Sequence, residues 1–197
     1  MSKSPQGAPS VNLLAVDTAT EGCSAACLTG DKSFERYAVD PQGHSRTLLG
    51  MVEAVLAEAR LERSALDALA YDAGPGSFTG IRIGAGVAQG LALGLEKPLL
   101  AVSSLMTLAE GARREQPDCN SVLAAIDARM DQVYWARLRS DPEAPGHWRW
   151  DEMPCVSEPR EVAVHISGCT GVGSGWDRYS DVFMGNRPMP WLVKRFP

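Results

Sequence analysis

The feature that most constrains this chain is a glycine-rich stretch from residue 72 to residue 94. Its first part, residues 74–76 (GPG), cannot continue a strand, because proline lacks an N–H and glycine favours unusual dihedral angles. Ser77 is a good N-cap for a helix that we expect over residues 78–95. Glycines recur inside that helix, several of them four residues apart: Gly80, Gly84, Gly86, Gly90 and Gly94. Each interior glycine costs about 0.5–1 kcal/mol relative to alanine, so we expect another backbone to approach this helix closely.

Two familiar glycine motifs do not fit this loop. A P-loop requires four residues between its glycines and then Gly-Lys-Ser/Thr, and no lysine follows Gly80. A nucleophile elbow requires Gly-x-Ser-x-Gly, whereas Pro75 stands two residues before Ser77. A tight turn before a closely packed helix remains the simplest interpretation, with a direct ligand role as the alternative.

Length and charge limit the classes of protein that this chain can represent. With 197 residues it can form one large or two small domains. Its net charge of −5 argues against nucleic-acid binding by the chain alone, since Lys and Arg contacts to phosphate supply most of that affinity. The sequence shows no apolar run that we expect to span a membrane. Five cysteines without a Cys-x-x-Cys pair are typical of a reducing cytoplasm.

The first half of the chain predicts the order β-β-β-α-β-α-β. We expect strands over residues 11–16, 23–28, 33–39, 66–71 and 99–102, and helices over 45–60 and 78–95. Three strands joined by short turns must be antiparallel, and strands joined by helices are parallel. This mixed order is that of the ribonuclease-H-like half domain, which occurs twice in actin-like ATPases.

The second half begins in the same way. A strand over residues 121–126 ends at Asp127, as the strand over 11–16 ends at Asp17, and each is followed by a turn and a return strand. We expect the return strand over 133–138 and a third strand over 147–150. The two halves therefore form an internal pseudo-repeat. The fold class expected is α/β, with two actin-like lobes of mixed sheets flanked by helices.

Three turns could carry chemistry in such a fold. Asp17, Thr18 and Thr20 follow the first strand, where backbone N–H groups and hydroxyls can hold phosphate. Asp127 stands at the corresponding place in the second half, but Arg and Met replace the small residues that would admit a phosphate. A third turn contains Gly171, Gly173 and Gly175, where an adenosine-contacting loop would lie. The alternative is that these turns are inherited from the fold without a ligand, because turn geometry alone selects Gly, Asp and Ser.

The sequence does not predict a metal site. The three histidines, His44, His147 and His165, are scattered and form no His-x-x-x-His or His-Glu-x-x-His pattern. Cys23 and Cys27 lie four residues apart on one face of an expected strand, which is typical of core side chains.

Several motifs together resemble the bacterial TsaB (YeaZ) family. They are residues 14–21 (LAVDTATE), 74–84 (GPGSFTGIRIG), 88–94 (AQGLALG), 124–130 (AAIDARM), 133–135 (VYW) and 171–176 (GVGSGW). The resemblance extends from about residue 13 to residue 176, and the GPGSFTG run with the AIDARM hairpin is specific.

The resemblance implies a role in making N6-threonylcarbamoyladenosine at position 37 of tRNAs that read codons beginning with A. TsaB is the non-catalytic paralogue of the catalytic subunit TsaD and pairs with it. TsaE, an ATPase, joins the pair, and TsaC supplies threonylcarbamoyl-adenylate. A His-x-x-x-His pair binds metal in TsaD, and the matching positions here are Ser104 and Leu108. The resemblance therefore implies no catalysis, no metal and no cofactor, with ATP or ADP bound at most at the interface with TsaD.

The expected organisation has three parts. Residues 1–10 form a leader without fixed structure, residues 11–103 the first lobe with the partner-binding helices, and residues 104–197 a degenerate second lobe. Family members continue with a further helix and a Tyr-Leu-Arg segment that residues 189–197 (MPWLVKRFP) do not match. We therefore expect a second lobe that is truncated or divergent at its C-terminal end.

The two helices of the first lobe predict how a partner is bound. They should lie side by side on one face of the sheet. We expect them to contact the equivalent pair of helices on TsaD. When TsaD is absent, we expect them to contact the same helices of a second copy, which gives a homodimer. The expected interface residues are Leu49, Met51, Leu56, Gly80, Gly84, Val87 and Gly90. We expect a cytoplasmic protein that contacts tRNA only within its complex. The open alternatives are an autonomous actin-like ATPase or small-molecule kinase, and a glycoprotease-like metallopeptidase.

Overall fold

The computed structural model describes residues 11–39, 43–144, 146–162 and 168–184. Within these ranges the chain forms two compact units. Unit 1 contains residues 11–73 and 77–101, and unit 2 contains residues 74–76 together with the residues from 102 onward. The expected leader and the divergent C-terminal segment lie outside the described residues.

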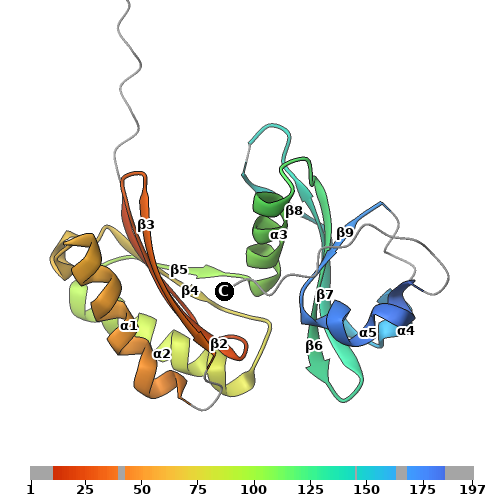
Figure 1. Cartoon of the computed structure of the whole chain (residues 1–197), viewed down its shortest axis with the longest axis horizontal. Coiled ribbons are helices and arrows are strands. Elements are labelled where there is room, and N and C mark those ends of the chain that lie inside the picture. The colour runs from red at the N-terminus through yellow and green to blue at the C-terminus, as the bar shows by residue number, and fades with distance from the viewer. Residues whose placement is uncertain (1–10, 40–42, 145, 163–167, 185–197) are drawn as a thin grey trace, which may run out of the picture. The chain divides into compact units, whose positions relative to one another are not determined.

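Unit 1 is a five-stranded mixed sheet in the order β3-β2-β1-β4-β5 (Figure 1). Its strands are β1 (Asn12–Asp17), β2 (Gly22–Thr29), β3 (Lys32–Val39), β4 (Ala68–Asp72) and β5 (Leu99–Val102). β2 pairs antiparallel with both β1 and β3, whereas β1 and β4 are parallel. The expected strands are therefore confirmed for this half of the chain, as are the expected directions of β1 to β4.

Two helices pack on this sheet. α1 spans His44–Ala59 and α2 spans Phe78–Leu95, and a short 3₁₀ helix covers Arg63–Ala65. Both helices share one hydrophobic core with β1, β2 and β4, and they contact each other. Ser77 caps α2 as expected, since its side chain accepts a hydrogen bond from the N–H of Gly80 at 3.3 Å. α1 begins one residue before the expected Ser45, after Gly43 as N-cap.

Unit 2 repeats the strand arrangement of unit 1. Its sheet has the order β8-β7-β6-β9. The strands are β6 (Ser121–Arg129), β7 (Gln132–Ser140), β8 (Trp148–Ser157) and β9 (Thr170–Val172). β6 pairs antiparallel with β7 and parallel with β9, as β1 does with β2 and β4. This correspondence confirms the predicted pseudo-repeat, although β8 extends well beyond the expected residues 147–150.

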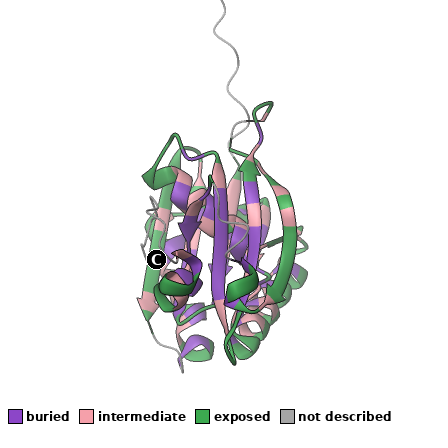
Figure 2. Ribbon diagram, turned by 90° about the vertical axis from the view of Figure 1, so that its right-hand side faces the viewer, coloured by how far each residue is buried: buried purple, intermediate pink, exposed green. Residues whose placement is uncertain are grey.

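Helices cover both faces of the unit 2 sheet. α3 (Ser104–Glu115) packs on one face, with Leu105 and Leu138 among its core residues. α4 (Pro159–Val162) and α5 (Ser174–Met184) pack on the other face around Trp176. Buried residues, purple in Figure 2, concentrate on the strands, while the helices keep exposed surfaces. The expected fold class, mixed sheets flanked by helices in two ribonuclease-H-like units, is thus confirmed.

By length and composition, α2 is long and apolar enough to cross a membrane, although the sequence analysis expected no such run. Length and composition alone are weak grounds for a membrane span, because a core helix of a soluble protein meets the same criteria. The more informative property is that only 22% of this helix is buried within the chain.

Candidate functional site

The first strand-turn-strand hairpin is closed by α2. Thr18 is 1% exposed, and its Oγ1 donates a 2.7 Å hydrogen bond to the carbonyl of Gly80. The N–H of Ser77 donates to the carbonyl of Ala19 at 2.6 Å. Thr20 is exposed, and its Oγ1 accepts from the N–H of Gly22 at 3.2 Å. Both threonine hydroxyls therefore make hydrogen bonds inside the chain at the place where a phosphate cradle was considered.

Glycine is required where α2 contacts the turn between β1 and β2. A Cβ added at Gly80 would lie 1.9 Å from the carbonyl oxygen of Thr18, and one added at Gly84 would lie 2.6 Å from Thr18 Oγ1. This confirms the expectation that another backbone approaches the helix closely. The approaching backbone belongs to the β1–β2 turn of the same unit, so these two glycines serve an intramolecular contact.

A pair of carboxyl groups lies at the ends of two adjacent parallel strands. Asp17 ends β1 and Asp72 ends β4, and the two side chains share a hydrogen bond. Burial raises the pKa of Asp17, while hydrogen bonds to the N–H of Ala19 and to Asp72, and the nearby His44, oppose that rise. The sequence analysis singled out Asp17 alone. The position of Asp72 at the end of a strand predicted to be parallel to β1 could have indicated this pair, because the C-terminal ends of parallel strands lie at the same edge of a sheet.

We expect Asp17→Asn to unfold at a higher temperature than the wild type at neutral pH. Because the folded-state pKa of Asp17 is raised, its ionisation opposes folding above that pKa, and stability falls as the pH rises through it. Asparagine keeps an oxygen for the N–H of Ala19 and cannot ionise. Thermal unfolding of both proteins across a pH series measures the effect. The advantage of the variant should shrink toward the ordinary pKa of aspartate, about 3.9, and an advantage that is constant with pH would contradict this account.

The second hairpin carries its own counter-ion. Arg178 of α5 places Nη1 3.1 Å from Oδ2 of Asp127, and the Tyr179 hydroxyl donates to Oδ1 at 3.5 Å. The N–H of Asp127 donates to Ser174 Oγ at 3.1 Å. The sequence analysis missed Arg178 and Tyr179, which stand about fifty residues away from Asp127 with no motif to connect them. The Asp127 carboxylate is thus paired with a cation from its own unit.

The turn after Asp127 is also unlike a phosphate cradle. Arg129, Met130 and Asp131 all adopt left-handed backbone conformations, with φ of 64°, 48° and 56°. Such conformations favour glycine and are costly for larger residues. Met130 is 88% exposed. The turn therefore projects a bulky side chain where small residues would be needed to surround a phosphate.

The third turn is filled by packing. A Cβ at Gly171 would lie 2.3 Å from the Trp176 ring, and one at Gly173 would lie 2.4 Å from the carbonyl oxygen of Ala125. A Cβ at Gly175 would lie 3.0 Å from Ala125. These three glycines permit close contacts with α5 and β6, which accounts for them without a nucleotide.

The two positions that the sequence resemblance matches to the metal ligands of TsaD lie in unit 2. Ser104, the first residue of α3, is 4% exposed, and Leu108 is a partly buried member of the α3 core. Across the described ranges, no group of three or more His, Cys, Asp or Glu side chains is arranged to hold a metal ion.

The expected interface residues fall into two groups. Leu49 is 48% exposed and Gly90 is exposed with open space around it, while Met51 and Val87 are partly buried against the core of unit 1. Leu56 was expected to face outward, but this was wrong because it is 4% exposed and packs in that core. Gly80 and Gly84 are buried against Thr18, as described above.

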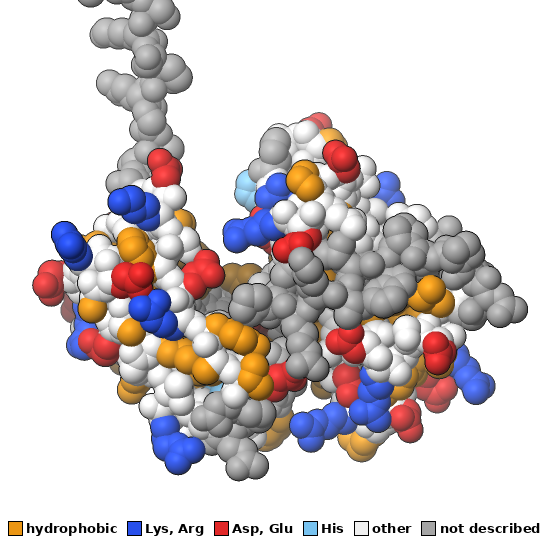
Figure 3. All heavy atoms as spheres, in the orientation of Figure 1, with side chains coloured by type: hydrophobic (Ala, Val, Ile, Leu, Met, Phe, Trp, Pro, Cys, Tyr) orange, Lys and Arg blue, Asp and Glu red, His pale blue; other side chains and the backbone are white. Residues whose placement is uncertain are grey.

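The sequence analysis missed the most exposed apolar side chains of α2. Phe78 is 73% exposed and Leu93 is 82% exposed. The guanidinium of Arg82 lies 3.3 Å from the centroid of the Phe78 ring. Gly86, Gly90 and Gly94 leave open space along the same helix. Hydrophobic side chains, orange in Figure 3, accordingly reach the surface of unit 1.

Comparisons with known proteins agree on one family. A family model described as "TsaD: tRNA N6-adenosine threonylcarbamoyltransferase" matches residues 39–144. The tRNA threonylcarbamoyladenosine biosynthesis protein TsaB of Escherichia coli is 43% identical over 87% of this chain and 75% of its own length. TsaB of Haemophilus influenzae is 38% identical over 86% of the chain and 75% of its own length.

A solved structure extends this agreement to the fold. YeaZ from Pseudomonas aeruginosa superposes with a TM-score of 0.83 and 44% identity, over 93% of this chain and 84% of that one. The identities, the coverage and the pseudo-repeated strand order lead to the same assignment: the chain belongs to the TsaB (YeaZ) family.

Proposed function

We propose that this chain is a non-catalytic subunit in the biosynthesis of N6-threonylcarbamoyladenosine at position 37 of tRNAs that read codons beginning with A. Its TsaB relatives carry this pathway in their names. The absence of catalysis is supported by the two hairpins, where Thr18 bonds to Gly80 and Asp127 pairs with Arg178. A protein with this task would act in the cytoplasm.

The observation that carries the proposal is the surface of α2. The helix is as apolar as a membrane-spanning helix, but only 22% of it is buried within the chain. Phe78 and Leu93 are exposed on it. Large apolar side chains that are exposed on a helix are candidates for burial against a partner. The open space at Gly86, Gly90 and Gly94 would let a partner helix approach closely.

The proposed partner is TsaD, whose family model matches part of this chain. A paralogue can present an equivalent helix pair, so α1 and α2 of the two proteins would form a four-helix interface. A second copy of the chain would cover the same surface by two-fold symmetry when TsaD is absent. TsaE would join this pair, TsaC would supply the activated intermediate, and ATP or ADP would bind at most at the interface. With a net charge of −5, the chain would bind tRNA appreciably only within the complex.

We expect Leu93→Glu to weaken both assemblies. Leu93 is 82% exposed, so the variant should fold normally, while a buried interfacial carboxylate should cost about 2 kcal/mol, or about 30-fold in affinity. Analytical ultracentrifugation measures the homodimer, and titration with TsaD measures the heterodimer. Met153→Glu, at a residue of unit 2 that is 67% exposed, is the matched control.

Two results would contradict the proposal. Unchanged affinity of folded Leu93→Glu for TsaD and for itself would exclude α2 as the shared interface. Magnesium-dependent ATP turnover by the isolated chain would instead favour an autonomous actin-like enzyme.

A further inference from the structure

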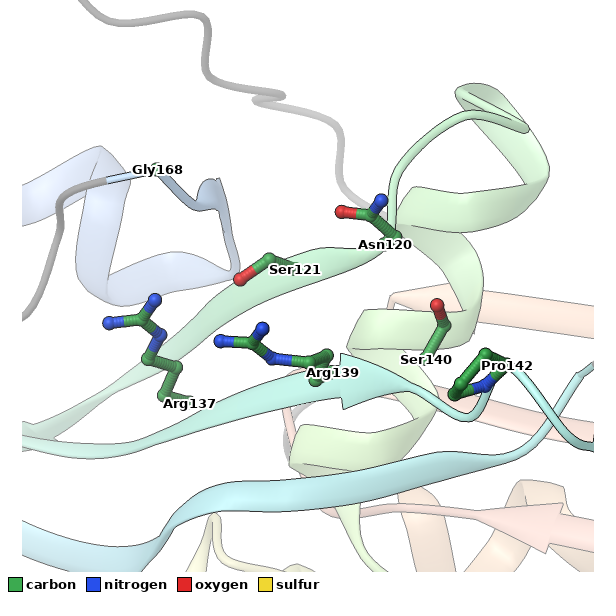
Figure 4. A pocket seen from close by; sticks show the side chains of 7 residues that line it. All are labelled: Asn120, Ser121, Arg137, Arg139, Ser140, Pro142 and Gly168. Atoms are coloured by element: carbon green, nitrogen blue, oxygen red, sulfur yellow. The ribbon is translucent and has the colours of Figure 1, made fainter.

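Unit 2 contains a pocket of about 330 Å³ that the proposed function does not use (Figure 4). It lies at the start of β6 and the end of β7. Its polar lining consists of Asn120, Ser121, Arg137, Arg139 and Ser140, with Gly168 at the border. The described residues that line the pocket include two arginines and no acidic residue.

The strand geometry explains why two arginines meet here. Arg137 and Arg139 are two residues apart on β7, so their side chains leave the same face of the sheet. Trp135 precedes them on that face and packs in the core with Val162 and Trp176. Figure 4 shows both guanidinium groups over this face, beside Ser121 of the neighbouring strand β6.

The two arginines of this pocket share the carboxylate of Asp151. Oδ2 of Asp151 lies 3.0 Å from Nε of Arg137 and 3.1 Å from an Nη atom of Arg139. One carboxylate oxygen therefore serves two cations. The Nε of Arg137 is buried and makes no hydrogen bond to any described residue, because Asp151 is poorly aligned with it. The nearby acid Asp141 is paired with Arg149, and neither residue lines the pocket.

We propose that this pocket binds a phosphate group, either free or in the backbone of an RNA. Two guanidinium groups offer planar pairs of N–H donors, which match the oxygens of phosphate. The amide of Asn120 and the hydroxyl of Ser121, whose Oγ lies 3.3 Å from Cys169 Sγ, add neutral polar groups around the same space. A tetrahedral anion can accept from donors that surround it, whereas the two oxygens of a carboxylate would leave several donors unpaired. A single phosphate contact remains compatible with weak tRNA binding by the lone chain.

Titration of the full chain with inorganic phosphate, followed by NMR or calorimetry at low salt, tests the site. We expect saturable binding in the millimolar range that falls about tenfold in Arg139→Gln, whose side chain is 59% exposed and can be replaced without loss of the fold. Arg137→Lys should also weaken binding, because it keeps the charge but loses the planar pair of donors. Arg114→Gln, at a 74% exposed side chain of α3 outside the pocket, should bind as the wild type does.

A parallel titration with a short RNA lacking terminal phosphates distinguishes the two sources. RNA binding that competes with phosphate and weakens in Arg139→Gln assigns the site to the backbone, and binding of inorganic phosphate alone assigns it to a free phosphate. The proposal is overturned if neither probe saturates, or if Arg114→Gln loses binding as much as Arg139→Gln does. Either result is independent of TsaD binding, so it leaves the proposed function untouched.

Discussion

Gly80→Ala is expected to destabilise the chain by about 3 kcal/mol, at the upper end of what overpacking costs. The added Cβ would lie 1.9 Å from the carbonyl oxygen of Thr18, a backbone atom that cannot rotate away. Either α2 or the β1–β2 turn would have to move, and the hydrogen bond from Thr18 Oγ1 to Gly80 would be disturbed. Urea unfolding followed by circular dichroism measures the free energy of unfolding.

The same helix provides the control. A Cβ at Gly86 meets no atom within 4 Å, so Gly86→Ala should raise stability by about 0.5–1 kcal/mol through helix propensity alone. If Gly80→Ala lowers the free energy of unfolding and Gly86→Ala raises it, the loss at Gly80 is steric and is not a general effect of replacing glycine. Gly80→Ala with wild-type stability would mean that the hairpin and α2 are not in contact.

Trp176→Ala should have the largest effect in unit 2, about 3–5 kcal/mol. The side chain is 1% exposed, and its Nε1 donates a 3.0 Å hydrogen bond to the carbonyl of Leu123. Its ring packs edge to face on Phe183, with centroids 4.9 Å apart, and lies against Gly171. Truncation would leave a cavity and remove the hydrogen bond to the Leu123 carbonyl. Chemical unfolding monitored by circular dichroism measures the loss.

Trp176→Phe separates the contribution of the hydrogen bond from that of the ring packing. Phenylalanine keeps an aromatic ring but cannot donate to Leu123, so we expect a smaller loss of about 1–3 kcal/mol. Met153→Ala, at an exposed position of the same unit, should change stability little. An alanine variant at Trp176 as stable as the phenylalanine variant would argue against a close-packed core around this residue.

Local patterns were sufficient to predict most of the elements. Alternation of apolar residues and short turns predicted β1, β2 and β3, and Ser77 predicted the start of α2, because these signals act within a few residues. The repeated strand-Asp-turn-strand pattern predicted the common strand order of the two units. The length of β8 was underestimated, since its exposed half lacks an apolar pattern.

Long-range contacts were beyond the reach of these patterns. The periodicity of α1 located an apolar surface but not its orientation, and Leu56 was therefore assigned to the wrong side. The glycines of α2 predicted a close approach, yet Thr18 stands 62 residues before Gly80. The pairing of Asp127 with Arg178 spans 51 residues and depends on how α5 packs on β6. Such contacts are fixed by tertiary packing, which leaves no local signature in the sequence.

The division of the chain has a consequence for folding during synthesis. Every residue of unit 1 that the structure describes precedes residue 102, so both its helices and its strands β1 to β4 are synthesised before β6. The loop 74–76 is the exception, because it belongs to unit 2 and the carbonyl of Gly74 accepts from the N–H of Ser104 at 2.9 Å. The loop that precedes α2 thus reaches its final hydrogen bonding only after translation has passed the start of α3.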